Sequence, residues 1–308
     1  MNSNFDDPKL SSYYAFMAMN KYANGADKIS RDALKDISSL KQIQQWLHEQ
    51  LKQNAVQANG LLTKKNQHWT SVQAIVGYAS FMRQQKSAQT NKQDMTNITD
   101  MRKRMVADAR KQAELNALAG INNARPLQAK LLDFFSNHFS VSRQNLAMLL
   151  LSPTLETEAI AGHLHLRFSD MLVAVTQHPA MLLYLNNERS IGPNSKLALN
   201  RKAKKRKQLG GLNENLAREI LELHTLGVNS GYTQSDVVEL AKSLTGWSVG
   251  NVRQQEPAGF VFRANSHEPE SRTVLGKQYP QQINKDQRGA NQAQGLAILH
   301  DLANHPAT

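Results

Sequence analysis

The segment from Gly211 to Trp247 contains two helical patterns joined by a glycine-rich turn. Apolar side chains in its first half recur at spacings of three and four residues, which places them on one face of a helix. Gly227 is expected to end the first helix, because glycine adopts the left-handed conformation at low cost. Thr233 or Ser235 is expected to cap the second helix. The segment therefore indicates a fold in which helices pack on helices.

The first helix of this segment is also rich in polar side chains that can take part in chemistry. They are Asn213, Glu214, Asn215, Arg218, Glu219, Glu222 and His224. At about 100° per residue, the apolar face is formed by Leu216, Ala217, Ile220, Leu221 and Leu223. His224 falls inside this face and is expected to be buried or half-buried, with Glu219 at the border. Arg218 lies four residues from both Glu214 and Glu222, the spacing of ion pairs on a helix surface.

Two interpretations of His224 stay open. A buried histidine is commonly a structural residue that hydrogen-bonds to a neighbouring carbonyl or carboxylate, and it can also be a metal ligand or a general base. The ladder around Arg218 is most simply a pair of stabilising surface contacts, each worth a few tenths of a kcal/mol.

The rest of the chain is expected to be mainly helical. Helical patterns cover Leu40–Leu51 after a cap at Ser38 or Ser39, Trp69–Met82, Met101–Leu118, Leu127–Phe139 after Pro126, a segment from the cap Ser142 to Leu151, Pro153–Val175, Ala180–Asn186 and Asn291–Leu302. Gln84–Asp94 and Ile191–Gly211 are expected to be loops. Short β-like runs around a polar turn predict a small hairpin from Gly259 to Tyr279. The expected fold class is all-α: a multi-helix domain with a small β-hairpin near residues 259–279.

Composition limits the classes of partner and site. The formal net charge is +12, and Arg201–Lys207 places six positive charges within seven residues. Such a run is commonly a solvated loop, and it can also dock an anionic polymer. A nucleic-acid role rests on charge alone and is not favoured, because no aromatic side chains interleave the run. The absence of cysteine excludes disulfides, thiolate metal sites and cysteine nucleophiles.

Membrane and export signals are not seen in the sequence. No apolar run approaches the roughly 18 residues that a membrane span requires, so no span is expected. The N-terminus has no basic segment followed by an apolar one, which predicts a cytoplasmic chain as written.

Several longer motifs carry a family resemblance. They are Leu131–Ser142, His178–Ser195, Gly211–Val237, Leu244–Trp247, His267–Pro269 with Val274–Gly276 and Tyr279, and Leu302–Thr308. In their order and spacing, the chain resembles the bacterial family catalogued as domain of unknown function 1800. The motifs fit from about Pro126 to the end, and the first third matches more loosely. Residues 1–125 are thus expected to be an N-terminal helical region and residues 126–308 the main region, in one continuous domain.

The resemblance implies a large, mostly helical bacterial protein of unestablished activity. Members are often exported, and they are often encoded beside a second uncharacterised family that looks like a sulfatase or alkaline phosphatase. Three features depart from the pattern: Phe135 stands where tryptophan is expected, no export signal is seen, and members continue beyond the final motif. We therefore expect a C-terminally incomplete chain.

Two hypotheses of function follow. In the first, the chain is a non-catalytic scaffold or binding protein. Its partner would be the sulfatase-like or phosphatase-like protein of the adjacent gene, and Arg201–Lys207 would contact an anionic polymer. The expectation that the C-terminus is incomplete favours this hypothesis.

In the second, the chain is a metal-dependent or acid/base hydrolase with a pocket around His224, Glu219 and His138. Its catalytic residues would be Glu219, His224 and Arg218. A divalent metal such as zinc, iron or manganese would bind His138, His224 and Glu219 with a further carboxylate or His267, because nitrogen and oxygen ligands suit these ions. Ligand-binding residues would be Asn213, Glu214, Asn194, Ser195 and His267.

Overall fold

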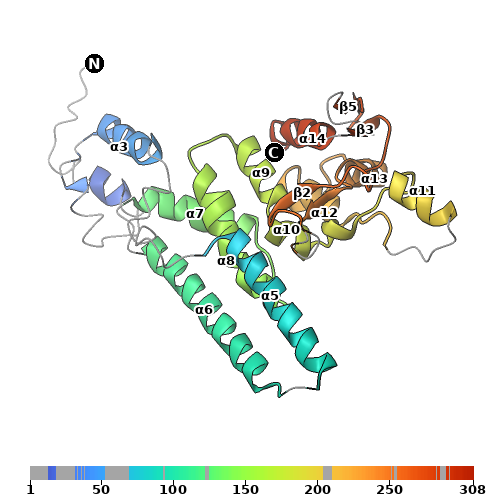
Figure 1. The fold of residues 1–308 in the computed structure, drawn as a ribbon. Coiled ribbons are helices and arrows are strands. Elements are labelled where there is room, and N and C mark those ends of the chain that lie inside the picture. Colours follow the sequence, from blue (N-terminus) through green and yellow to red (C-terminus); the bar gives the residue numbers. More distant parts are fainter. Residues whose placement is uncertain are drawn as a thin grey trace.

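A computed structural model of the chain (Figure 1) describes residues 13–18, 32, 34, 35, 37, 39–52, 69–92, 94–121, 125–203, 210–250, 252, 255–281, 283–284, 289–290 and 292–308. The α-helices of the described residues include α3 (Leu40–Lys52), α5 (Ser71–Thr90), α6 (Thr96–Ile121), α7 (Pro126–His138), α8 (Leu146–Thr154), α9 (Phe168–Gln177), α10 (Pro179–Tyr184), α11 (Lys196–Ala203), α12 (Asn215–Glu219), α13 (Gln234–Ser243) and α14 (Ala293–Ala303). Helices of other types are the π-helices η1 (Leu155–Ile160) and η4 (Ile220–His224) and the 3-10 helices η2 (Ala161–His163) and η3 (Asn187–Arg189). The fold is mostly helical, as the sequence predicts.

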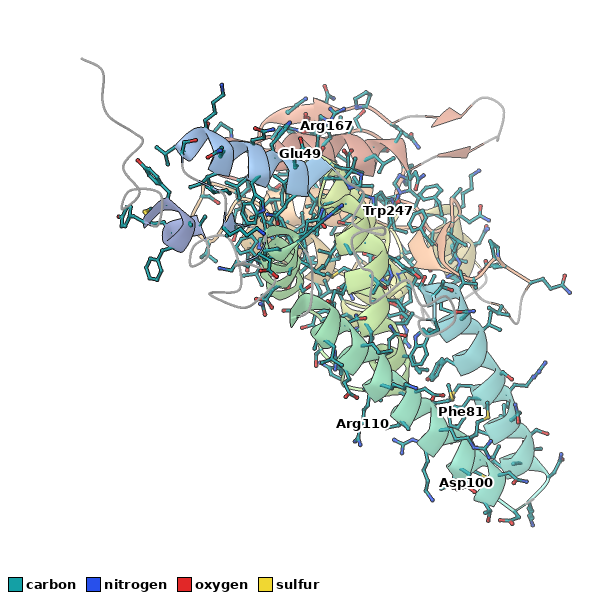
Figure 2. All side chains as sticks on the ribbon, turned by 90° about the vertical axis from the view of Figure 1, so that its left-hand side faces the viewer. Glu49, Phe81, Asp100, Arg110, Arg167 and Trp247 are labelled. Atoms are coloured by element: carbon teal, nitrogen blue, oxygen red, sulfur yellow. The ribbon has the colours of Figure 1, made fainter. Side chains whose placement is uncertain are left out.

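Helices α5 and α6 form a long hairpin that extends away from the other helices (Figure 1). The loop predicted over Gln84–Asp94 is wrong, because α5 continues to Thr90. The physical reason is burial: Phe81 and Ala88 of α5 pack with Ile98 of α6, and this contact outweighs the polar composition of the segment. Figure 2 shows Phe81 where the two helices meet.

Local signals set several helix ends. Ser39 caps α3 by accepting from the Gln42 amide, and Pro126 occupies the first turn of α7, both as predicted. The predicted cap at Ser142 is wrong, because Asn145 accepts from the Met148 amide and α8 begins after it. The continuous helix predicted over Pro153–Val175 is also wrong. α8 runs through Pro153 to Thr154, η1 and η2 follow it, and the turn at 164–167 separates them from α9.

The β-strands form two-stranded antiparallel sheets. In these, β1 (Trp247–Val249) pairs with β2 (Phe260–Phe262), β3 (Arg272–Val274) with β4 (Lys277–Tyr279), and β5 (Ile283–Asn284) with β6 (Gly289–Ala290). A small β excursion is thus confirmed, but its predicted pairing is wrong. The run at 260–262 pairs with β1, which comes before it in the sequence, while the run at 272–279 forms a hairpin by itself. Leu275 and Gly276, both at positive φ, form the turn of that hairpin.

One apolar core draws on residues from Ala74 to Leu302, on both sides of residue 125. Trp247, which is labelled in Figure 2, is fully buried in this core. Gly295 lets α14 approach it closely, since a Cβ atom there would lie 2.9 Å from the indole ring.

The loop predicted over Ile191–Gly211 is wrong in part, because α11 occupies part of this range. Lys204–Lys207 lie outside the described residues. Within the described ranges, no helix has the length and apolar character needed to cross a membrane.

Candidate functional site

The first helix of the segment at 211–247 changes character in its middle. It begins as α12 and continues as the π-helix η4. Four of the five residues predicted for its apolar face are buried, but Leu223 is 56% exposed. The prediction for Leu223 is wrong because the i→i+5 hydrogen bonds of a π-helix change the angle between successive side chains. His224 is 2% exposed, so its predicted burial is confirmed.

His138 of α7 meets His224 across the core. His138 Nε2 lies 3.1 Å from the His224 backbone oxygen. Since a carbonyl only accepts, His138 Nε2 carries the hydrogen and donates it. The two imidazole centroids are 5.9 Å apart, and the His224 ring also packs edge-on against Phe139.

His224 is held in its neutral form. Burial, with a smaller contribution from His138, lowers the pKa of His224 to about 3. Its Nδ1 atom is buried and has no hydrogen-bond partner among the described residues. The structure thus brings together two of the residues proposed as metal ligands, His138 and His224. The hydrogen bond between them joins the His138 ring to the His224 backbone oxygen, and not to the His224 ring.

The remaining proposed metal ligands do not join this pair. His267 donates from Nδ1 to the Thr245 backbone oxygen, 2.8 Å away. Across the part of the chain that the structure describes, no three histidine, aspartate or glutamate side chains come together as a metal site. Glu219 lies at the end of α12, where burial, with a smaller contribution from Glu222, raises its pKa. The catalytic roles proposed for Glu219, His224 and Arg218 stay predictions.

The Arg218 ladder is formed as its spacing predicts. Arg218 Nη1 lies 3.0 Å from Glu222 Oε1, and Nη2 lies 3.3 Å from Glu214 Oε2. Nη2 also donates to Gln234 Oε1 at 2.7 Å, which ties the start of α13 to α12. Asn213 serves the helix start as well, since its Oδ1 accepts from the Asn215 amide. These contacts give Asn213, Glu214 and Arg218 a role in helix packing.

Asn194, Ser195 and His267 lie around a residue that the sequence did not single out, Glu268. The buried Glu268 carboxylate accepts from the Asn194 amide and from Asn194 Nδ2, each at 2.8 Å. The Glu268 amide donates to Thr245 Oγ1, and Ser195 Oγ accepts from the Ala198 amide at the start of α11. We call Asn194, Thr245, His267 and Glu268 the Glu268 cluster. It fastens the turn before α11 to the loop after β2.

A pocket of about 1100 Å³ opens between α6, α7 and η1. We call it the α6–α7 pocket; its polar and aromatic lining includes Asn116, Lys130, Asp133, Phe134, Ser136, His138, Arg143 and Glu156. His138 thus connects the histidine pair to this pocket. The Phe134 side chain is 59% exposed and stacks parallel to the His138 ring.

Glu156 is the most perturbed carboxyl of this pocket. Asn116 Nδ2 donates to Glu156 Oε2 at 3.1 Å, and Gln112 Nε2 donates in turn to Asn116 Oδ1. Burial raises the pKa of Glu156, and the charge of Asp133 adds to this, while Asn116 and Arg143 oppose it. Glu156 is not among the candidate site residues predicted from the sequence. No local spacing connects residues 116, 133 and 156, so only the packing of α6, α7 and η1 reveals their proximity.

Comparisons with known proteins bear on the family. A family model described as a protein of unknown function (DUF1800) matches residues 18–308. No curated protein and no solved structure matches the chain. The family predicted from the motifs is confirmed.

Proposed function

The chain belongs to the DUF1800 family, whose function is unknown, and we propose that it is a binding protein that holds a saccharide segment in the α6–α7 pocket. The main support is that the pocket combines the exposed ring of Phe134 with the carboxyl group of Glu156, which the side-chain amide of Asn116 holds in place. Ligand sites of proteins pair apolar surface with a few positioned polar groups in this way.

The lining fits a ligand with an apolar face and a rim of hydroxyl groups. Phe134 offers an exposed ring face, and Asp133 and Glu156 accept hydrogen bonds. Lys130 and Arg143 supply donors, and the buried Ser136 Oγ has no partner in the described ranges. A sugar ring presents hydroxyls that both donate and accept, so it can use groups of both kinds.

A glycan array, followed by calorimetry on the best oligosaccharide, tests the proposal. We expect Phe134→Ala and Glu156→Gln each to weaken binding by about tenfold, since each removes one contact worth about 1 kcal/mol or more. Leu223→Ala is the matched control, because Leu223 is an exposed apolar residue that does not line this pocket. Absence of saccharide binding, or binding that neither pocket variant weakens, would contradict the proposal.

A second candidate is acid/base hydrolysis of the bound saccharide. Its support is the raised pKa of Glu156, caused by burial and then by Asp133. Glu156 would give its proton to the glycosidic oxygen as the C–O bond breaks, while Asp133 takes a proton from the water that forms the new C–O bond. The rate should then fall as pH rises through the pKa of Glu156.

Chromatography of the bound oligosaccharide after long incubation separates the two candidates. Cleavage that disappears in Glu156→Gln while binding remains measurable would establish the enzyme. An intact oligosaccharide bound by the wild-type chain would establish the binding protein.

The adjacent-gene partner is part of the proposal. A saccharide-binding chain could hold an anionic polymer for a sulfatase-like or phosphatase-like enzyme. Co-purification of the two gene products, with and without polymer, tests this point. Lack of association in both conditions would contradict the proposed partnership.

A further inference from the structure

A second pocket, of about 770 Å³, lies where α5 and α8 face η3 and β1. Its apolar lining includes Tyr78 and Met82 from α5 and Leu183 from α10. Its polar lining includes Glu188 from η3 and Arg263, which follows β2. We call it the Glu188 pocket. It shares no lining residue with the α6–α7 pocket, so it is independent of the proposed function.

One oxygen of the Glu188 carboxyl has no hydrogen-bond partner in the part of the chain that is described. Its Oε1 atom lies 3.1 Å from Arg189 Nε. Its Oε2 atom is buried and has no hydrogen-bond partner in the part of the chain that is described, although the side chain as a whole is 14% exposed. A buried acceptor without a donor destabilises the folded chain, so a ligand that supplies a donor gains affinity.

Arg263 does not supply that donor in this structure, because its guanidinium bonds to other groups. Nη1 donates to Ser248 Oγ at 2.7 Å, and Nη2 donates to the Val249 oxygen and to Glu256 Oε2. Formal charges of Glu188, Arg189, Glu256 and Arg263 cancel in pairs. A neutral donor therefore fits this environment better than an added charge of either sign.

We propose that the Glu188 pocket binds a neutral ligand that has an aliphatic body and a terminal O–H or N–H donor. The aliphatic body would lie against Tyr78, Met82 and Leu183, and the donor would hydrogen-bond to Glu188 Oε2. The ligand class is thus that of a long-chain alcohol or primary amide.

A series of C8 probes that differ only in the head group tests this class on the full chain. The probes are 1-octanol, octanamide, octanoate and octylammonium, titrated by ligand-observed NMR. We expect octanol and octanamide to bind about tenfold more tightly than octanoate, which has no donor and repels Glu188. Equal binding of octanol and octanoate, or tightest binding of octylammonium, would overturn the proposal.

Two variants localise the binding to this pocket. Glu188→Gln replaces one oxygen by an amide donor, so the preference should shift toward octanoate by about tenfold. Ala79→Trp fills the pocket from α5 and should abolish binding of all four probes. Glu270→Gln removes the same charge at an exposed position outside the pocket and should change nothing. An unchanged preference in Glu188→Gln would sink the proposal even if octanol binds.

Discussion

His224 shows how one buried side chain can make stability depend on pH. Its ring sits among Phe139 and His138, with Nδ1 unpartnered within the described ranges. Protonation would place a charge on a ring that is buried in the core and lies beside His138. The folded chain therefore holds His224 neutral, with a pKa of about 3.

We predict that acid weakens the wild-type fold through His224. The unfolded residue binds a proton near pH 6.5, whereas the folded residue does not until about pH 3. The stability that depends on neutral His224 is fully present above about pH 6.5. Below that value, the free energy of unfolding falls by about 1.4 kcal/mol per pH unit. Urea titrations between pH 7.5 and 4.5 should show a shallower decline for His224→Gln.

His165→Gln is the control, because His165 is exposed. A decline in His224→Gln that matches the wild-type chain would show that another group dominates acid unfolding.

At the scale of elements, the Glu268 cluster joins the turn before α11 to the loop after β2. The turn passes so close that Gly192 has no room for a side chain. A Cβ atom there would lie 2.5 Å from Glu268 Oε2 and 2.7 Å from Glu268 Cα. Glycine is therefore required at this position because Glu268 lies so close to it, and not because the backbone has a positive φ.

We predict that Gly192→Ala destabilises the chain by about 1–3 kcal/mol, because the Glu268 cluster must shift to admit the methyl group. Gly211→Ala is the matched control, since a Cβ atom at Gly211 meets nothing within 4 Å. Denaturant midpoints measure the difference. Equal midpoints for both variants would show that the turn at Gly192 can shift away from Glu268 without loss of stability.

Asp236 connects a second pair of elements, α13 and the β3–β4 hairpin. Its carboxylate accepts from the Thr233 amide and hydroxyl at the start of α13. It also accepts from the Leu275 amide at the hairpin turn, at 2.7 Å. Burial opposes ionisation, but the hydrogen bonds from Thr233 and Leu275 outweigh it and lower the pKa of Asp236.

We predict that Asp236→Asn costs about 2 kcal/mol at pH 7, because hydrogen bonds to a charged acceptor are stronger than neutral ones. The contribution is present above the unfolded pKa of about 3.9 and is lost as pH falls through the lower folded pKa. Thermal unfolding at pH 7 and pH 3 should therefore show a smaller wild-type advantage in acid. Asp100→Asn, at a more exposed position on α6, provides the baseline; a pH-independent advantage would contradict this account.

The whole molecule is basic, and its densest run of charge begins on α11, at one edge of the fold (Figure 1). Lys202 is exposed near the end of α11. Comparable numbers of positive charges lie along α6, where Arg102, Lys103, Arg104, Arg110 and Lys111 are exposed. The two sets allow local density to be separated from net charge.

We predict that the run at 201–207 governs binding to an anionic polysaccharide. Changing Lys202, Lys204, Lys205, Arg206 and Lys207 to glutamine should lower the salt concentration that elutes the chain from immobilised heparin. It should also reduce the dependence of affinity on salt, because fewer counterions are released. The control changes the five α6 residues to glutamine, with the same change in net charge. Equal elution of the two variants would show that only net charge matters.

Local chemistry explains what could be predicted from the sequence. Pro126 at the start of α7 and Thr233 at the start of α13 are set by neighbours within four residues. Gly227 adopts a φ of +87°, as the end of its helix requires. His224 could be predicted to face inward because burial on a helix follows from spacing along the chain.

Tertiary structure decided what depends on residues far apart in sequence. Phe81 and Ala88 are helical because Ile98 buries them, although their neighbours have a loop-like composition. The strand at 260–262 pairs with 247–249, and Glu156 meets Asn116, through packing that no local pattern encodes. Residue spacing and motifs along the chain were enough to predict a mostly helical member of the DUF1800 family with a histidine facing inward. Only the fold decided which groups share its pockets, because burial, desolvation and long-range hydrogen bonds exist only once the helices have packed.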